Sequence, residues 1–251
     1  MAGQMELAMR GVTNLERGIA VAAGIGLLAA LAFALAPGAG ASRAKAPKIW
    51  VIGSGTLSKP QVVVRAKPKD SARRIKVLHE FRRDFSPQYV VALSAIRNKK
   101  GKATWYRISL PGRPNGQAGW VRAGSLELRI VKKRLLIDRG ERRFEFWHGD
   151  TLVRAGKVAV GAPGAETPTG LFYVQSKFFP QAEILGAFAF ETSAYSKLSD
   201  WPGGGVVGVH GTPWPWLLGQ AVSHGCVRLH NDDVLFLRSR VPPGTPIKIV
   251  P

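Results

Sequence analysis

Short apolar runs alternate with turn residues along the chain from residue 47 to about residue 125. The runs are rich in Val, Ile and aromatic residues, and Gly, Pro, Ser and Asp separate them. This pattern is typical of short β-strands in a small all-β barrel. The predicted strands cover residues 49–52, 61–64, 75–78, 89–93, 104–108 and 119–122.

A second β-rich pattern runs from residue 126 to the last residue, and Gly- and Pro-rich clusters interrupt it. One short helix is expected within it. Asn231 would cap this helix, Asp232 and Asp233 would complement its positive N-terminal end, and residues 234–241 would form its body before a Pro-Pro-Gly stop. The predicted strands cover residues 126–130, 134–137, 143–147, 152–160, 206–210 and 245–250.

An uncharged stretch of Ala, Leu, Ile, Val, Gly and Phe covers residues 19–36, after Arg10 and Arg17. As a helix, this stretch would span roughly 27 Å, which is near the hydrocarbon thickness of a bilayer. The stretch therefore predicts export. Either the segment stays as a membrane anchor, or it is a signal peptide that is cleaved at the small residues 39–41.

The chain has 251 residues, of which 45% are hydrophobic, and this is enough for two modest domains. The predicted organisation is a membrane or signal segment with a linker at 1–46, a β-barrel at 47–125 and a β-rich domain at 126–251. The net charge is +20, and residues 47–126 carry +14 of it. We therefore expect the barrel to contact an anionic wall or membrane surface, with a solvated basic face as the alternative.

Cys226 is the only cysteine, and it ends the sequence Ser223-His224-Gly225-Cys226. One cysteine cannot form an internal disulfide, so in an exported protein this thiol is either buried and inert or reactive. A nearby imidazole would make it a good nucleophile. His210 ends a predicted strand, whereas His224 lies two residues before the cysteine, on the same side of an extended chain. From the residues alone, either histidine could be the base.

The residues next to Cys226 also suit acyl transfer. Gly225 permits a close backbone approach, and the N–H groups of Gly225 and Cys226 could bind an oxyanion. Arg228 could bind a substrate carboxylate or brace the loop. A zinc site is disfavoured because no second cysteine or suitably spaced carboxylate accompanies the histidines. We expect no metal and no cofactor.

Two segments resemble the signature of the L,D-transpeptidase (YkuD-type) catalytic domain: Val-His-Gly-Thr at 209–212 and Ser-His-Gly-Cys-Val-Arg-Leu at 223–229. The resemblance extends over about residues 127–251. Further matches are Gly161, Thr-Pro-Thr-Gly at 167–170, Thr-Ser-Ala-Tyr-Ser at 192–196 and Gly-Thr-Pro at 244–246.

The region before this domain resembles bacterial SH3-like domains more loosely, through Trp-Tyr-Arg-Ile at 105–108 and Gly-Trp-Val at 119–121. The two resemblances together imply a mainly β protein. With the apolar stretch at 19–36, the expected order is an N-terminal membrane segment, a small SH3-like barrel and a β-rich catalytic domain with a short helix after the nucleophile.

The L,D-transpeptidase resemblance also implies roles for individual residues. Cys226 would attack the substrate, His210 would accept and donate the proton, and the Gly211 carbonyl would orient the imidazole. The oxyanion-binding and positioning residues would be Ser223, His224, Gly225 and Arg228. Six aromatic residues could line a groove or lid, although core packing is the alternative for most of them: Phe188, Phe190, Tyr195, Trp201, Trp214 and Trp216.

The implied activity is the formation of 3→3 cross-links between peptidoglycan stem peptides, through a cysteine thioester and outside the cytoplasm. One alternative is a cysteine-dependent L,D-carboxypeptidase or hydrolase of the same wall peptides. A second is a non-catalytic wall-binding protein, which the basic barrel suggests. Nucleic acid is not an expected partner, because export separates the protein from it and no recognised binding motif appears.

Overall fold

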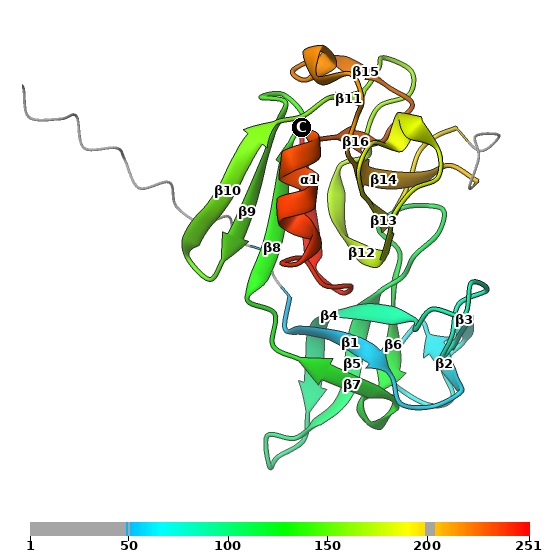
Figure 1. Cartoon of the computed structure of the whole chain (residues 1–251). Helices are drawn as coiled ribbons and strands as arrows, with labels where there is room; N and C mark the ends of the chain where they lie inside the picture. Colours follow the sequence, from blue (N-terminus) through cyan, green and yellow to red (C-terminus); the bar gives the residue numbers. More distant parts are fainter. Residues whose placement is uncertain (1–48, 50, 199–203) are drawn as a thin grey trace, which may run out of the picture. The chain divides into compact units, whose positions relative to one another are not determined.

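The computed structural model describes residues 49, 51–198 and 204–251, and the chain in these ranges is mainly β (Figure 1). The apolar segment at residues 19–36 lies outside the described residues. Among the residues that are described, no helix is both long and apolar enough to cross a membrane.

The first sheet has seven strands in the order β3-β2-β6-β5-β4-β1-β7, and each neighbouring pair is antiparallel. Its inner face buries Val62, Val64, Val90, Ile108 and Val121. The strands are β1 (Gly53–Leu57), β2 (Gln61–Arg65), β3 (Arg74–His79), β4 (Tyr89–Arg97), β5 (Ala103–Ser109), β6 (Ala118–Arg122) and β7 (Leu126–Arg129), with the 3-10 turn η1 (Ala123–Ser125) between the last two.

Two features of this sheet differ from the sequence analysis. The predicted strand at 49–52 begins later, at Gly53, and Ile52 contributes only an N–H bond to the Ala92 carbonyl. β7, which we placed at the start of the second domain, pairs with β1. The pairing follows from burial, because Leu126 packs in the core of the first sheet. Gly55 permits the close approach, since a Cβ there would lie 1.7 Å from the Glu127 carbonyl oxygen.

The second sheet has eight strands in the order β10-β9-β8-β17-β12-β13-β14-β16. The C-terminal strand β17 lies inside it, parallel to β8 and antiparallel to β12. The strands are β8 (Lys133–Asp138), β9 (Arg143–His148), β10 (Thr151–Lys157), β12 (Gly170–Phe178), β13 (Ala189–Tyr195), β14 (Val206–His210), β16 (Val227–Arg228) and β17 (Pro246–Val250). A separate parallel pair joins β11 (Val160–Gly161) to β15 (Ala221–Ser223).

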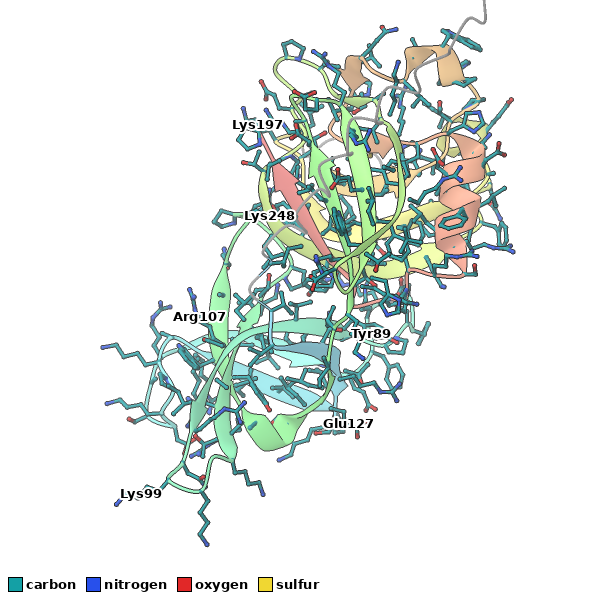
Figure 2. All side chains as sticks on the ribbon, turned by 90° about the vertical axis from the view of Figure 1, so that its left-hand side faces the viewer. Tyr89, Lys99, Arg107, Glu127, Lys197 and Lys248 are labelled. Carbon is teal, nitrogen blue, oxygen red and sulfur yellow. The ribbon has the colours of Figure 1, made fainter. Side chains whose placement is uncertain are left out.

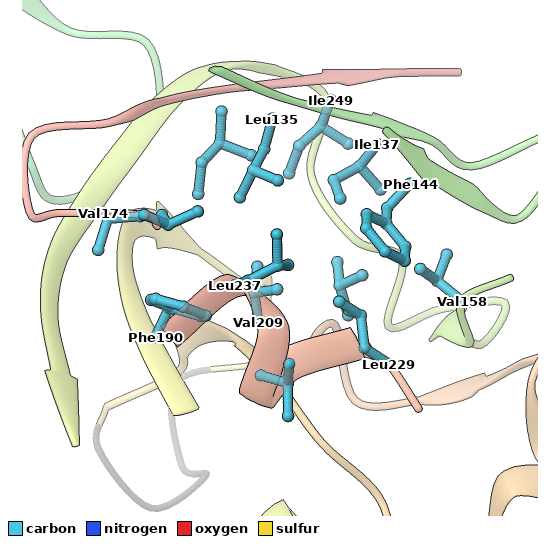
Figure 3. Close-up of a cluster of buried hydrophobic side chains, with 14 of the residues drawn as sticks. Leu135, Ile137, Phe144, Val158, Val174, Phe190, Val209, Leu229, Leu237 and Ile249 are labelled. Carbon is cyan, nitrogen blue, oxygen red and sulfur yellow. The ribbon is translucent and has the colours of Figure 1, made fainter. Parts of the chain in front are cut away.

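The helix α1 (Asn231–Arg238) packs its apolar side on this sheet. Figure 3 shows Leu237 among side chains from several strands, including Leu135, Ile137, Phe144 and Ile249, all of which are buried. The cluster extends to Val209 on β14 and Leu229 just after β16, so the strands that carry the candidate residues are anchored in the core. Two 3-10 turns, η2 (Glu183–Leu185) and η3 (Pro215–Leu217), lie in the connections.

The cap of α1 differs by one residue from the expectation. His230 is the N-cap, and its Nδ1 accepts a hydrogen bond from Asp232 N at 3.3 Å. Asn231, which we expected to cap, is the first residue of the helix, and its Oδ1 accepts from Ala187 N at 3.0 Å. The asparagine therefore ties α1 to the segment before β13 and is not available as a cap.

Candidate active site

Adjacent parallel strands bring Cys226 and His210 together. In the β14–β16 pair, Val209 lies opposite Val227 and His210 opposite Arg228, so Cys226 comes next to Gly208. The Gly208 N–H donates to Cys226 Sγ at 3.3 Å. A Cβ added at Gly208 would lie 3.4 Å from His210 Cδ2 and 3.7 Å from Cys226 Sγ, so imidazole and thiol border the same point.

His210 is buried, with 3% of its surface exposed, and its Nδ1 lies 2.6 Å from the Gly211 carbonyl oxygen. A carbonyl only accepts hydrogen bonds, so Nδ1 carries the proton and Nε2 is left as the basic nitrogen. Burial lowers the pKa of His210 to about 4, although the carbonyls of Gly211 and Leu185 oppose this shift. The imidazole is therefore neutral at pH 7 and able to accept a proton.

Burial raises the pKa of the Cys226 thiol, while the Gly208 N–H and the positive charge of Arg228 partly offset the effect. The shifts at the two residues have opposite directions. Burial therefore favours the neutral form of both the thiol and the imidazole. The proton then has to move as the sulfur attacks, which is general-base catalysis of a nucleophile.

The turn before Cys226 is closed by Ser223. Its Oγ donates to the Cys226 carbonyl at 2.6 Å and accepts from Gly225 N at 3.1 Å. Gly225 has a φ of 115°, and a Cβ there would lie 2.9 Å from Ser196 Oγ, so only glycine fits. The Gly225 N–H, which we expected to bind an oxyanion, is thus already bonded. The Cys226 N–H makes no hydrogen bond to any described residue and remains available.

The upstream glycine and threonine motif supports this turn from the other side. Gly161 pairs with Ser223, and Ala162 N donates to the Ser223 carbonyl at 2.8 Å. Gly161 N also donates to Thr167 Oγ1 at 2.9 Å, and a Cβ at Gly161 would lie 2.2 Å from the Ala165 carbonyl oxygen. The motif is therefore part of the scaffold that holds the cysteine segment.

Arg228 and His224, the two remaining charged or ionisable candidates, differ in burial. Arg228 is buried, with its guanidinium 5.8 Å from the centre of the Trp214 ring, and its charge lowers the pKa values of both His210 and Cys226. The side chain of His224 is exposed, and its carbonyl accepts from Ser196 Oγ at 3.0 Å. The histidine nearer to the cysteine in sequence is therefore outside the buried part of the site.

A pocket of about 440 Å³ opens onto the pair. Its wall is mostly apolar, and Gly208, His210, Cys226 and Glu191 are its polar or reactive part. The other lining residues are Phe178, Ala182, Ile184, Leu185, Ala189, Phe190 and Val206. Of the aromatic candidates, Phe190 lines this pocket, Phe188 packs in the core, Trp216 is exposed and Trp201 lies outside the described residues.

Sequence reasoning missed Glu191. This carboxylate lines the pocket, accepts from Ser176 Oγ at 2.6 Å and forms an ion pair with Arg82 of the loop between β3 and β4. Nothing in the pattern around Glu191 distinguishes it from a surface carboxylate. Gly208 was also missed, although a glycine two residues before a candidate histidine is a signal of close packing.

The family model for the L,D-transpeptidase catalytic domain (YkuD) matches residues 132–249. A putative L,D-transpeptidase YkuD of Bacillus licheniformis is 36% identical over 121 residues, which are 48% of this chain and 67% of that protein. The chain belongs to the YkuD-type L,D-transpeptidase family. The same-named Bacillus subtilis protein is 29% identical over 154 residues, covering 57% of this chain and 88% of its own length.

Among solved structures, an L,D-transpeptidase from Mycobacterium tuberculosis H37Rv aligns with 81% of this chain and 100% of its own, at 16% identity and a TM-score of 0.44. Cys226, His210 and the residues around them all lie inside the matched YkuD region. The protein is therefore an enzyme of the L,D-transpeptidase class that acts on peptidoglycan, a substrate found outside the cytoplasm.

Proposed function

We propose that this L,D-transpeptidase joins two stem peptides by 3→3 cross-links and that Cys226 carries the acyl group between them. The observation that supports this most directly is the pocket in which Gly208 N–H, the Cys226 thiol and the buried His210 meet. Cys226 is also the only thiol of the chain, so a thioester has no other attachment site.

In the first step, Cys226 Sγ attacks the carbonyl of the third residue of a donor tetrapeptide, and its proton passes to Nε2 of His210. The carbonyl oxygen becomes an oxyanion, for which the unpaired Cys226 N–H is a donor. The peptide C–N bond then breaks. His210 returns the proton to the leaving amine, D-alanine departs, and the thioester remains.

In the second step, the side-chain amine of an acceptor stem peptide attacks the thioester carbonyl. His210 takes the proton of this amine, the C–S bond breaks, and the thiol is restored as the new amide forms. Water in place of the amine would give hydrolysis instead. The mostly apolar pocket wall favours the amine, because it offers few partners for an ordered water.

The test is to incubate purified enzyme with disaccharide-tetrapeptides and to identify the products by mass spectrometry. We expect a cross-linked dimer that has lost one D-alanine, and no product from the Cys226→Ala variant. Tripeptide without dimer would support the carboxypeptidase alternative. A Cys226→Ala variant that still made dimer would overturn the role of the cysteine.

We also propose that residues 47–125 form an SH3-like domain between an export segment at 1–46 and the catalytic domain, with β7 completing its sheet. Its excess of positive charge would hold the enzyme at an anionic surface of the wall or the membrane. The test is sedimentation with isolated sacculi and with anionic vesicles at increasing salt. Binding that is insensitive to salt, or absent from both, would contradict this proposal.

A further inference from the structure

The loop between β5 and β6 reaches the end of strand β13. The side-chain amide of Asn115 donates from Nδ2 to the Tyr195 carbonyl at 2.7 Å and accepts at Oδ1 from Tyr195 N at 2.9 Å. One side chain thus satisfies both backbone groups of one residue. Two such bonds in a ring fix the position of the Tyr195 backbone relative to the loop.

Arg113, in the same loop, binds three carbonyl oxygens beyond Tyr195. Its Nη2 donates to Ser196 at 2.9 Å and to Leu198 at 3.0 Å, and its Nη1 donates to Gly204 at 2.8 Å. The guanidinium also lies 5.0 Å from the centre of the Tyr195 ring. Arg113 therefore joins the two ends of the connection between β13 and β14, on either side of residues 199–203.

Ser196 connects this contact to the catalytic turn. Its Oγ donates to the His224 carbonyl at 3.0 Å, while Ser223 Oγ accepts from the next amide, Gly225 N. The peptide unit between His224 and Gly225 is thus held at both its C=O and its N–H. Because the N–H of Cys226 follows directly, the direction of that donor depends on these two serine contacts.

We propose that the loop carrying Arg113 and Asn115 is a positioning element of the catalytic centre. By holding Tyr195 and Ser196, it orients the His224–Gly225 peptide and hence the Cys226 N–H toward the oxyanion of acyl transfer. The inference rests on the proposed function, because an oxyanion forms only in that reaction. It gives the basic first sheet a role in turnover that is separate from any binding to the wall.

The test compares two reactions of Cys226 in the full chain. A carbapenem acylates the thiol: the S–C bond forms, the β-lactam C–N bond breaks, and the ring nitrogen takes the proton after an oxyanion intermediate. Iodoacetamide alkylates the same thiol by displacing iodide, with no oxyanion. Asn115→Ala should slow acylation by roughly tenfold, because a misplaced oxyanion donor costs at least this much, and should leave alkylation within about twofold.

Ser196→Ala should act in the same direction, and the double variant with Asn115→Ala should be no slower than the slower single variant, since both act on one peptide unit. Asn115→Asp keeps the bond from Tyr195 N but sets a carboxylate oxygen, which can only accept, against the Tyr195 carbonyl, so it should also slow acylation. Lys99→Ala is the matched control, because Lys99 is exposed at the tip of the β4–β5 hairpin (Figure 2).

Equal rates of acylation in Asn115→Ala and wild type would overturn the inference. So would a parallel fall of acylation and alkylation, which indicates general damage to the fold. If Asn115→Ala does not fold, the comparison of Ser196→Ala with Asn115→Asp decides in the same way. A wild-type enzyme that the carbapenem does not acylate would instead count against the proposed function.

Discussion

Both sheets are built from short β-strands, but they differ in how these strands pair. In the first sheet every neighbouring pair is antiparallel, and its core is a simple face of Val, Ile and Leu. The second sheet includes two parallel pairs: β8 with β17, which come from the beginning and the end of the domain, and β14 with β16, which residues 211–226 connect. The cysteine and the histidine meet at one of these parallel pairs. The comparison indicates that parallel pairing in the second sheet sets the turn that carries Cys226 beside the strand that carries His210, whereas the described strands of the first sheet pair only in the antiparallel sense.

The prediction with the largest expected effect concerns the rate of acylation and a residue of the second sheet, His210. His210→Gln retains a polar side chain but has no basic nitrogen to accept the Cys226 proton. We expect acylation by a carbapenem to fall by about 10²–10⁴-fold, which is the usual contribution of a general base. Stopped-flow absorbance measures the rate. Glutamine at His79, on an edge strand of the first sheet, is the control and should change nothing. A rate within tenfold of wild type would shift the role to another group, such as His224.

We also expect a residue of the second sheet, His210, to make the free energy of unfolding depend on pH. The pKa of His210 falls from its ordinary value near 6.5 to about 4 on folding, so the unfolded chain binds more protons between these values. Stability is then present above pH 6.5 and is lost as the pH falls toward 4, by up to about 3 kcal/mol from this one group. Urea unfolding at pH 7 and pH 4.5 measures the loss, and His210→Gln should reduce it. An unchanged pH dependence in the variant would contradict the assignment.

A glycine pair compares the sheets directly. Gly225→Ala puts a Cβ at a φ of 115° and 2.9 Å from Ser196 Oγ, whereas Gly101→Ala in the first sheet has a φ of 77° with open space around it. Both changes should cost about 1–3 kcal/mol of stability from backbone strain. Only Gly225→Ala should also slow acylation, by roughly tenfold or more, because the Cys226 N–H moves. Thermal unfolding and acylation rates measure the two effects. Equal acylation in both variants would show that the turn tolerates displacement.

The same contrast explains what the sequence could predict. Strands β2 to β6 follow from local alternation, and β14 and β17 from runs that end at clear turn signals. Strand β12 carries no comparable alternation and was missed, because it lies between two strands with both faces largely covered.

At the site, the motif predicts Cys226 and His210 as the reacting pair, while spacing alone leaves His224 equally eligible. Only the fold gives a physical reason to prefer His210, because the pairing of β14 with β16 brings this histidine close to Cys226. The bonds of Asn115 to Tyr195 at the end of β13, and of Arg113 to the residues after it, could not be predicted, because they join polar side chains to backbone atoms across long stretches of chain. The Gly225 amide is a similar case, since its bond to Ser223 depends on the exact turn.

The smallest expected effects compare one ion pair from each sheet. Asp233 is 8% exposed and accepts from Arg154 Nε at 2.7 Å, whereas Asp70 forms an exposed pair with Arg122. Asp233→Ala should lower the free energy of unfolding by about 1–3 kcal/mol, because it leaves a partly buried guanidinium without its partner. Asp70→Ala should leave the melting temperature unchanged within error, since solvent screens an exposed pair. Calorimetry measures both. If the exposed pair proved the more stabilising of the two, the first sheet would depend on its surface charges for folding.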